Sequence, residues 1–148
     1  MLLGTTNHGI DAKGRIIIPA KWRDDLGEVI VITLGLINNG DARCLFAMSV
    51  DQWMQFSAKF TSLSETNTAG QNIRRLLFMN ASDCEMDKQG RILIPQKLRD
   101  YAGIKNETSL VGMQTRVEIW DSETLDRISG SIQDNYNEFW ATLAEQGI

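Results

Sequence analysis

The sequence predicts an α+β fold in which two similar halves form one compact domain, followed by a C-terminal helix. Three observations predict it: a fourteen-residue pattern that occurs twice, the same order of strands and helices after each copy, and an amphipathic tail. The two copies span residues 11–24 and 87–100, lie 76 positions apart and are identical at nine of the fourteen positions. Within a chain of 148 residues, such a match indicates an internal duplication.

Each copy begins with Asp-x-x-Gly-Arg, continues as Ile-x-Ile-Pro and ends in Lys-x-Arg-Asp. Aspartate at the first position and glycine at the fourth are typical of a type I turn, and glycine tolerates a positive φ where the chain re-enters a strand. We therefore expect each turn to form the tip of a hairpin. Pro19 and Pro95 have no amide donor, so each should end its strand and open a short helix, over 20–26 and 96–102. The glycine after each helix closes it.

A second shared order follows the short helices, with two apolar strands, a turn between them and then a longer helix. In the first half the strands are expected over 29–34 and 44–47 around a turn at 37–41, and in the second over 108–111 and 117–120 around a turn at 114–116. Ser49 and Ser122 are the expected N-caps of the helices that follow.

The linker and the tail set the boundaries of the two halves. Polar and small residues over 64–70 are typical of a linker, and a helix is expected over 71–78. The tail carries apolar residues at helical spacing, which predicts an amphipathic helix with an aromatic face that a core or a neighbouring subunit could bury. These residues are Ile132, Tyr136, Phe139, Trp140 and Leu143. The expected division is 1–63, first half; 64–80, connecting segment and helix; 81–130, second half; and 131–148, C-terminal amphipathic helix.

Positive charge is concentrated in the two copies. Each copy holds four basic and two acidic side chains, whereas the rest of the chain carries a net charge of −8 and the whole chain −4. This composition argues against a uniformly basic nucleic-acid binder and indicates two basic islands on an acidic body. The acidic pole is the C-terminal stretch, because seven acidic residues and only Arg127 lie between Glu118 and Glu145.

Several functional classes are disfavoured by the residues present. Two cysteines without Cys-x-x-Cys spacing and a single histidine predict no metal site and no cofactor. No catalytic set of side chains stands out, so the chain is not expected to be an enzyme. The N-terminus lacks a secretory signal and no segment approaches ~18 consecutive apolar residues, so we expect a soluble cytoplasmic protein without a membrane partner.

These motifs resemble the MraZ family of bacterial regulators over roughly residues 1–120. The resemblance rests on the paired Asp-x-x-Gly-Arg-Ile-x-Ile-Pro segments, the Arg-Arg-Leu-Leu-Phe segment at 74–78 and the Leu-Arg-Asp-Tyr-Ala-Gly ending at 98–103. The sequence is similar, more distantly, to the AbrB and MazE swapped-hairpin DNA-binding domains. The resemblance implies two pseudo-symmetric, swapped-hairpin-like halves in a ring-like homo-oligomer. It also implies a nucleoid-associated repressor that binds short direct repeats in double-stranded DNA, upstream of its own division and cell-wall gene cluster.

The resemblance places the DNA-binding element of the family, Asp-x-x-x-Arg, on one pair of residues in each half. An arginine beside a turn can offer a planar fork to a phosphate or a guanine edge, while the aspartate holds that fork in place and nearby lysines contact phosphate. An open alternative is that the aspartate only caps its turn and pairs with the arginine to keep the turn folded. The candidate DNA-binding residues are Asp11, Lys13 and Arg15 in the first half and Asp87, Lys88 and Arg91 in the second.

The remaining basic residues are expected to have ordinary surface roles. Arg74 and Arg75 are interpreted as surface or interface residues. A solvated basic face on the two short helices, or ion pairs with Asp24 and Asp100, would explain the other four. These are Lys21, Arg23, Lys97 and Arg99.

Two functions from different classes fit the sequence. A few basic contacts per turn give only weak, salt-sensitive binding, so a DNA-binding regulator needs an oligomer that displays several turns to repeated sites. The alternative is an antitoxin-type protein-interaction module, in which the hairpins only dimerise and the C-terminal helix captures a partner. A footprint on repeated upstream DNA favours the regulator, and purification with a stoichiometric second protein favours the alternative.

Overall fold

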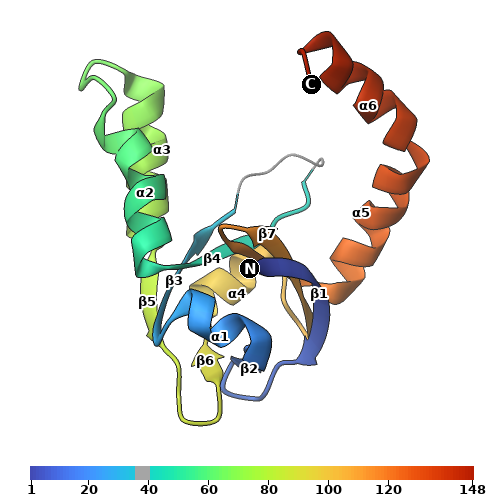
Figure 1. Cartoon of the computed structure of the whole chain (residues 1–148). Coiled ribbons are helices and arrows are strands. Elements are labelled where there is room, and N and C mark those ends of the chain that lie inside the picture. The colour runs from blue at the N-terminus through green and yellow to red at the C-terminus, as the bar shows by residue number, and fades with distance from the viewer. Residues whose placement is uncertain (36–40) are drawn as a thin grey trace.

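A six-stranded antiparallel sheet carries most of the fold, and two short strands form a second sheet beside it (Figure 1). The computed structural model describes residues 1–35 and 41–148. The strands are β1 (Leu2–Gly9), β2 (Arg15–Ile17), β3 (Val29–Leu34), β4 (Leu45–Ser49), β5 (Ser82–Glu85), β6 (Arg91–Leu93), β7 (Glu107–Gln114) and β8 (Val117–Asp121). The helices are α1 (Ala20–Leu26), α2 (Val50–Thr61), α3 (Thr68–Met79), α4 (Gln96–Ala102), α5 (Ser122–Asp134) and α6 (Tyr136–Glu145).

The order of the large sheet is symmetric between the two halves. It runs β1-β7-β8-β4-β3-β5, and exchanging each strand for its counterpart in the other half reverses the same order. The first strand of each half pairs with a strand of the other: β1 pairs with β7, and β5 pairs with β3. The two halves are therefore interleaved, which confirms an α+β fold of two swapped halves in one compact domain.

The second sheet is the centre of this exchange. Strand β2 pairs with β6, so that Ile16 of the first half lies opposite Ile92 of the second. The backbone N–H of Ile18 donates to the carbonyl of Gly90 (2.8 Å), and that of Ile94 donates to the carbonyl of Gly14 (2.9 Å). Each turn is thus attached to the other half by a backbone hydrogen bond.

The expectation of a local hairpin in each half is wrong, although the turns exist. Strands β1 and β2 flank the first turn but belong to different sheets, and the same holds for β5 and β6 at the second turn. A short hairpin alone would bury too little apolar surface to be stable. Pairing the two copies instead buries their isoleucines in a single core. These are Ile16, Ile18, Ile92 and Ile94.

Alternating side chains on the central strands place two clusters on opposite faces of the large sheet. On β4, Leu45 and Ala47 face the larger cluster, whereas Phe46 and Met48 face the smaller one. The larger cluster includes Trp22 of α1 and residues of α4, β2 and β6; the smaller one includes residues of α2 and α5. One face of the sheet therefore holds the second sheet, and the other holds α5 and part of α2, while Leu77 of α3 reaches the larger cluster.

The short helices agree with the sequence prediction, and one of the two predicted serine caps is wrong. Helices α1 and α4 have the predicted bounds and end at Gly27 (φ 80°) and Gly103 (φ 64°). The Ser49 side chain caps α2 by accepting from the backbone N–H of Gln52. Ser122 is instead the first residue of α5, because the Asp121 carboxylate accepts from the backbone N–H of Thr124 and caps the helix one residue earlier.

Two helical arms project from the large sheet, on the side opposite to the turns (Figure 1). One consists of α2 and α3, which confirms a helix over 71–78. The other consists of α5 and α6, which meet at Asn135, so the predicted tail helix is the end of α5 followed by α6. Among the described residues, no helix is long and apolar enough to cross a membrane.

The two turns predicted between paired strands have different outcomes. The expected turn at 37–41 lies almost entirely outside the described residues. The turn at 114–116 joins β7 to β8, and its Gln114 has a φ of 67°. Strand β7 is longer than predicted because both of its edges are paired, one with β1 and the other with β8.

Candidate nucleic-acid interface

The Asp11 carboxylate holds the first turn by accepting three hydrogen bonds. One carboxylate oxygen accepts from the backbone N–H groups of Lys13 and Arg15, both at 2.9 Å. The other accepts from the Arg15 Nε at 2.7 Å. The Gly14 N–H closes the turn on the Asp11 carbonyl at 3.0 Å, with φ at 90°. Aspartate, glycine and arginine together therefore determine the shape of the turn.

The second turn repeats this arrangement around Asp87. Its carboxylate accepts from the backbone N–H groups of Gln89 and Arg91, both at 2.9 Å, and from the Arg91 Nε at 2.8 Å. The Gly90 N–H donates to the Asp87 carbonyl at 3.0 Å, and Gly90 has a φ of 78°. Each of these four hydrogen bonds agrees with its counterpart in the first turn to within 0.1 Å.

Both aspartates are charged at neutral pH. The hydrogen bond from the Arg15 backbone N–H, assisted by the Arg15 side chain, lowers the pKa of Asp11 to about 2. The corresponding bond from the Arg91 backbone N–H lowers the pKa of Asp87 below its ordinary value. Each carboxylate is therefore a permanent anchor for its arginine.

The arginines keep part of their hydrogen-bonding capacity for a ligand. Only the Nε of Arg15 and of Arg91 bonds to protein within the described residues, and the two side chains are 30% and 29% exposed. The remaining guanidinium N–H groups can meet a phosphate or a guanine edge. The aspartate does stabilise the turn, as the alternative interpretation expects, but this role leaves the outer edge of the guanidinium available.

The fold brings all six predicted site residues to one end of the molecule. Both turns protrude from the same end, below the second sheet and opposite to the helical arms (Figure 1). Lys13 and Lys88 are exposed on them, at the third position of the first turn and at the second position of the second. Two cationic turns from halves 76 residues apart thus share a single surface.

Within residues 1–35 and 41–148, the lysines of the short helices do not form ion pairs, which were one of the two explanations that the sequence offered for them. Neither Asp24 nor Asp100 has a salt bridge in the described part of the chain. The Lys21 ammonium lies 5.4 Å from the centre of the Trp22 ring, and the Lys97 Nζ donates to the Met79 carbonyl at the end of α3 (2.9 Å). Lys21 therefore has an aromatic partner and Lys97 a backbone carbonyl partner.

The arginines of the short helices have a structural role that the sequence prediction missed. The Nε of Arg23 donates to the Ile18 carbonyl and that of Arg99 donates to the Ile94 carbonyl, both at 2.9 Å. The available signal was their position, because each lies nine residues after a turn glycine and is identical in the two copies.

The arginine pair on α3 lies on a helical arm away from the turns. The Arg74 guanidinium lies 5.4 Å from the centre of the Phe78 ring, and Arg75 donates to the side chain of Asn72 at 3.0 Å. This location agrees with the prediction of a surface or interface role.

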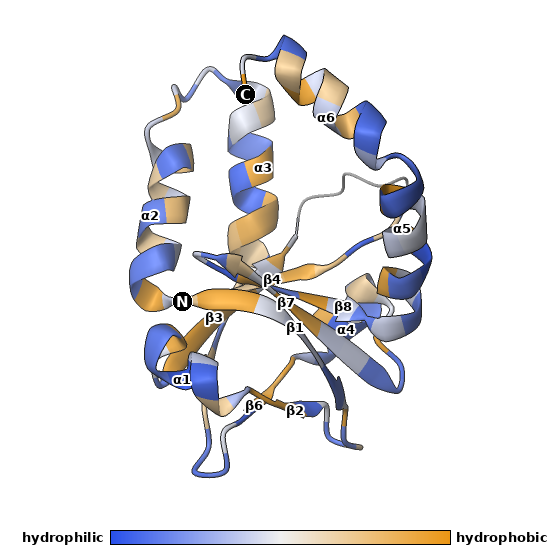
Figure 2. Ribbon diagram, turned by 45° about the vertical axis from the view of Figure 1, so that its right-hand side comes forward, coloured by the Kyte–Doolittle hydropathy of each residue, from blue (hydrophilic) through white to orange (hydrophobic). Residues whose placement is uncertain are grey.

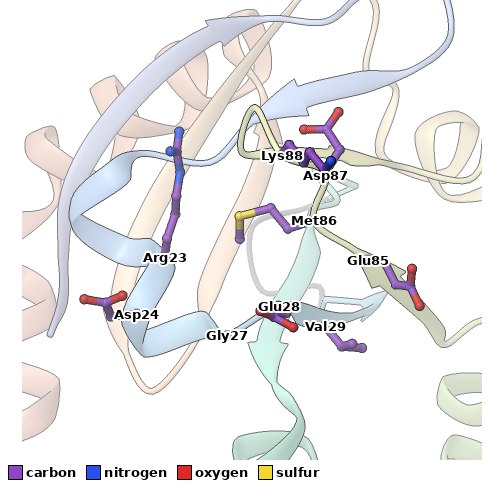
Figure 3. A pocket seen from close by; sticks show the side chains of 9 residues that line it. All are labelled: Arg23, Asp24, Gly27, Glu28, Val29, Glu85, Met86, Asp87 and Lys88. Atoms are coloured by element: carbon purple, nitrogen blue, oxygen red, sulfur yellow. The ribbon is translucent and has the colours of Figure 1, made fainter.

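An open pocket of about 620 Å³ lies beside the second turn (Figure 3). Arg23 lines one side and Asp87 with Lys88 the other, and three further carboxylates lie along it. These belong to Asp24, Glu28 and Glu85. The described residues contain no group of three or more histidine, cysteine, aspartate or glutamate side chains able to hold a metal ion.

The two cysteines are buried free thiols. Burial raises the pKa of Cys44 to about 12 and also raises the pKa of Cys84. Because the thiolate is the nucleophile and the metal ligand, neither side chain is prepared for these roles at neutral pH.

The chain matches known proteins over its whole length. The family described as "MraZ protein, putative antitoxin-like" matches twice, over residues 1–76 and 77–144. A relative from Acetivibrio thermocellus, named transcriptional regulator MraZ, is 45% identical over all 148 residues of this chain and over its own full length. A relative of the same name from Thermoanaerobacter sp. is 44% identical over the full length of both chains. Another of the same name, from Caldicellulosiruptor bescii, is 46% identical over 81% of this chain and 80% of its own length. The chain therefore belongs to the MraZ family, whose matched members are named transcriptional regulators.

Proposed function

We propose that this protein is a sequence-specific DNA-binding regulator of repressor type that binds short direct repeats through its two turns. The observation that carries the proposal is the presence, at one end of the molecule, of two equivalent turns that each hold an arginine by Nε and leave its outer edge open. The transcriptional-regulator names of the relatives support the same function.

Each predicted site residue has a distinct role in this proposal. Arg15 and Arg91 present planar forks to base edges or phosphates, and Asp11 and Asp87 fix the direction of those forks. The exposed lysines contribute charge to phosphate contacts, which set register and orientation without reading bases. These are Lys13 and Lys88.

Binding to DNA requires several copies of the chain. One pair of turns on an acidic body provides few phosphate contacts, whereas a ring that displays many turns to repeated sites makes the later contacts intramolecular. We propose a ring-like homo-oligomer for this reason. Exposed apolar residues on both arms support it, because such faces seldom remain in water. They include Ile73, Leu76 and Met79 on α3 and Tyr136, Phe139 and Trp140 on α6. Figure 2 shows hydrophobic segments along both helices.

Charge on the arms favours a contact between α3 of one copy and α6 of the next. Helix α3 carries Arg74 and Arg75 and no acidic residue, whereas α6 carries Glu138 and Glu145 and no basic residue. A contact between two different surfaces repeats from copy to copy, and it closes into a ring when the rotation permits. The turns point away from the arms, so this contact leaves them available for DNA (Figure 1).

The proposed operator is a set of short direct repeats upstream of the chain's own gene, in a division and cell-wall gene cluster, which would place the protein on the nucleoid.

The test is binding of the full chain to that upstream DNA, measured by fluorescence anisotropy and by footprinting. Probes with one, two and three repeats, and a probe of identical composition with scrambled repeats, are compared at several salt concentrations. We expect protection confined to the repeats, a steep gain in affinity with repeat number, and weaker binding when half a helical turn separates the repeats. Equal affinity for the scrambled probe would refute sequence-specific regulation, and equal affinity for one and three repeats would refute the multivalent ring.

A second candidate is the antitoxin-type module, which the antitoxin-like description of the family and the exposed aromatic face of α6 favour. Under this function the arm captures a protein partner and the turns serve only to join the halves. Purification of the chain with a stoichiometric second protein, together with no footprint on the upstream DNA, would favour it. Replacing Tyr136 and Trp140 with alanine should then release that partner.

A further inference from the structure

Arg23 and Arg99 each reach across the molecule to the turn of the other repeat. A Cβ atom built on Gly14 would lie 2.5 Å from the Arg99 Cζ and 2.6 Å from its Nε. A Cβ built on Gly90 would likewise overlap the Arg23 guanidinium. Each planar guanidinium therefore lies directly against the glycine of the opposite turn, and a larger residue there would fit only if the arginine side chain moved.

Each of these arginines is also anchored within its own repeat. The Arg99 Nε donates to the Ile94 carbonyl (2.9 Å), while the Ile94 N–H donates to the Gly14 carbonyl (2.9 Å). Ile94, the residue after β6, thus bonds to the arginine through its carbonyl and to the covered turn through its N–H.

The first repeat contacts the turn of the second repeat in the same way. The Arg23 Nε donates to the Ile18 carbonyl (2.9 Å), and the Ile18 N–H donates to the Gly90 carbonyl (2.8 Å). Both arginines are half-buried, so their position is restrained by packing as well as by hydrogen bonds. Figure 3 shows Arg23 facing the pocket that Asp87 and Lys88 line from the other side.

We propose that Arg99 positions the first DNA-binding turn and Arg23 positions the second, so that each repeat sets the reading geometry of the other. This inference rests on the proposed function of the turns. In each turn the aspartate fixes the arginine from within, and the opposite arginine fixes the glycine from outside. A single repeat would therefore lack the arginine that supports its turn, because that arginine comes from the other repeat. The geometries of the two turns are thus coupled.

A direct contact between these arginines and DNA phosphate is the competing explanation for any loss of binding. The two explanations differ in what they predict without DNA. A positioning arginine restrains the opposite turn in the free protein, whereas a phosphate contact affects only the complex. They also differ in chemistry, because lysine preserves a phosphate contact but cannot stack a plane on glycine or donate from Nε.

The first test is hydrogen–deuterium exchange on the full-length protein without DNA. We expect Arg99→Ala to speed exchange of the Lys13 and Arg15 amides by about 5- to 10-fold, the range expected when a supporting hydrogen bond is lost. The amides of Gln89 and Arg91 should be unaffected. Arg23→Ala should give the reverse pattern, and each variant is therefore the matched control for the other. Faster exchange in the variant's own turn, or equally in both, would overturn the proposal.

Substitution of the covered glycine gives a second test. Gly14→Ala drives a methyl group into the Arg99 guanidinium, so part of its effect should disappear in Arg99→Ala, although the strain at positive φ remains. In Arg23→Ala the same substitution should have its full effect. Denaturant unfolding of the two double variants and the corresponding single variants measures this difference. Equal effects of Gly14→Ala in both backgrounds would overturn the contact between Arg99 and the first turn.

DNA binding supplies the third test, with lysine as the charge-preserving control. Arg99→Lys should weaken binding to the repeats nearly as much as Arg99→Ala. If the alanine variant does not fold, the lysine variant alone tests the positioning role. Arg99→Ala should add little to Arg15→Ala and its full effect to Arg91→Ala. Rescue by lysine would overturn the positioning role. If the unaltered protein binds no repeat DNA, the proposed function fails, while the exchange pattern still decides whether the turns are positioned crosswise.

Discussion

The two repeats have matching turns but different arms. Every hydrogen bond of the first turn recurs in the second, although the residues between aspartate and glycine are Ala12 and Lys13 in one and Lys88 and Gln89 in the other. The arms share no such agreement, because α2 packs beside α3 in a helical hairpin whereas α5 continues into α6. The turn geometry thus depends on three residue types, and the surrounding residues are free to differ.

The surroundings of the turns also differ in charge. Glu28 and Glu85 line the pocket beside the second turn, whereas the residues 76 positions away, Ile104 and Gly9, are uncharged. Carboxylates near a cationic turn weaken its attraction for phosphate over about a Debye length, ~8 Å at physiological salt. We therefore expect the first turn to contribute more DNA affinity than the second.

The largest expected effect concerns the arms. Truncation after Ser129 removes the end of α5 and all of α6 with its exposed aromatic residues, so the proposed ring should dissociate and affinity for three direct repeats should fall by about 100-fold. Affinity for a single repeat should be preserved, because the turns lie at the other end of the molecule. Mass measurement in solution and anisotropy on both probes test this, with Tyr136→Ala as a milder variant. Unchanged mass and stability with loss of single-repeat binding would show that the tail itself contacts DNA or a partner.

The next prediction compares the two arginines. Arg15→Ala should weaken binding to the repeats by about 100-fold and Arg91→Ala by about 10-fold, since a bidentate contact has effects in this range and the second turn has the more acidic surroundings. The thermal midpoint should change by less than about 4 °C, because partly solvent-exposed ion pairs contribute little to stability. Titration calorimetry with repeat DNA and thermal unfolding measure both quantities. A larger loss from Arg91→Ala would reverse the ranking, and loss of folding in either variant would favour a purely structural role.

The sequence alone predicts how each turn forms, but it does not predict which strands pair beside the turns. Asp11, Gly14 and Arg15 interact within five residues, so their chemistry can be read locally, and Pro19 marks the following helix in the same way. The pairing of β2 with β6 cannot be predicted from neighbouring residues. It depends on whether a strand buries its isoleucines better against its own half or against the equivalent strand of the other half. This explains why a hairpin was the natural but wrong prediction.

The same limit applies to the candidate site. Its six predicted residues follow from the repeated motif, but the position of Arg23 and Arg99 over the opposite turns depends on the exchange of strands between halves. An ion pair with an acidic neighbour in sequence is the local expectation for a basic helix residue. Tertiary packing instead supplies the Ile18 and Ile94 carbonyls as partners.

A smaller effect is expected from removing a charge beside the second turn. Glu85→Gln should strengthen binding to repeat DNA by about 2- to 3-fold at low salt and by less at high salt, because it removes a negative charge from the pocket that Lys88 lines. Glu65→Gln makes the same change of charge in the exposed linker between α2 and α3 and should have little effect. Salt-dependent anisotropy on both variants decides the matter, and equal gains would mean that net charge matters rather than location.

The smallest expected effect is a pH dependence of stability that originates at Asp11. Its pKa is about 2 in the folded protein, against 3.8 ordinarily, so its carboxylate stabilises the fold above about pH 4 and this contribution is lost as the pH falls toward 2. In this window the unfolded chain binds more protons than the folded chain, and stability must therefore rise with pH. Asp11→Asn retains an oxygen that can accept from the backbone N–H groups but does not titrate, so its stability should change less between pH 4 and pH 2. Denaturant unfolding across this range measures the difference between the two proteins, which should shrink as the pH falls. A difference that stays constant would show that the Asp11 hydrogen bonds do not stabilise the first turn through the charge of the carboxylate.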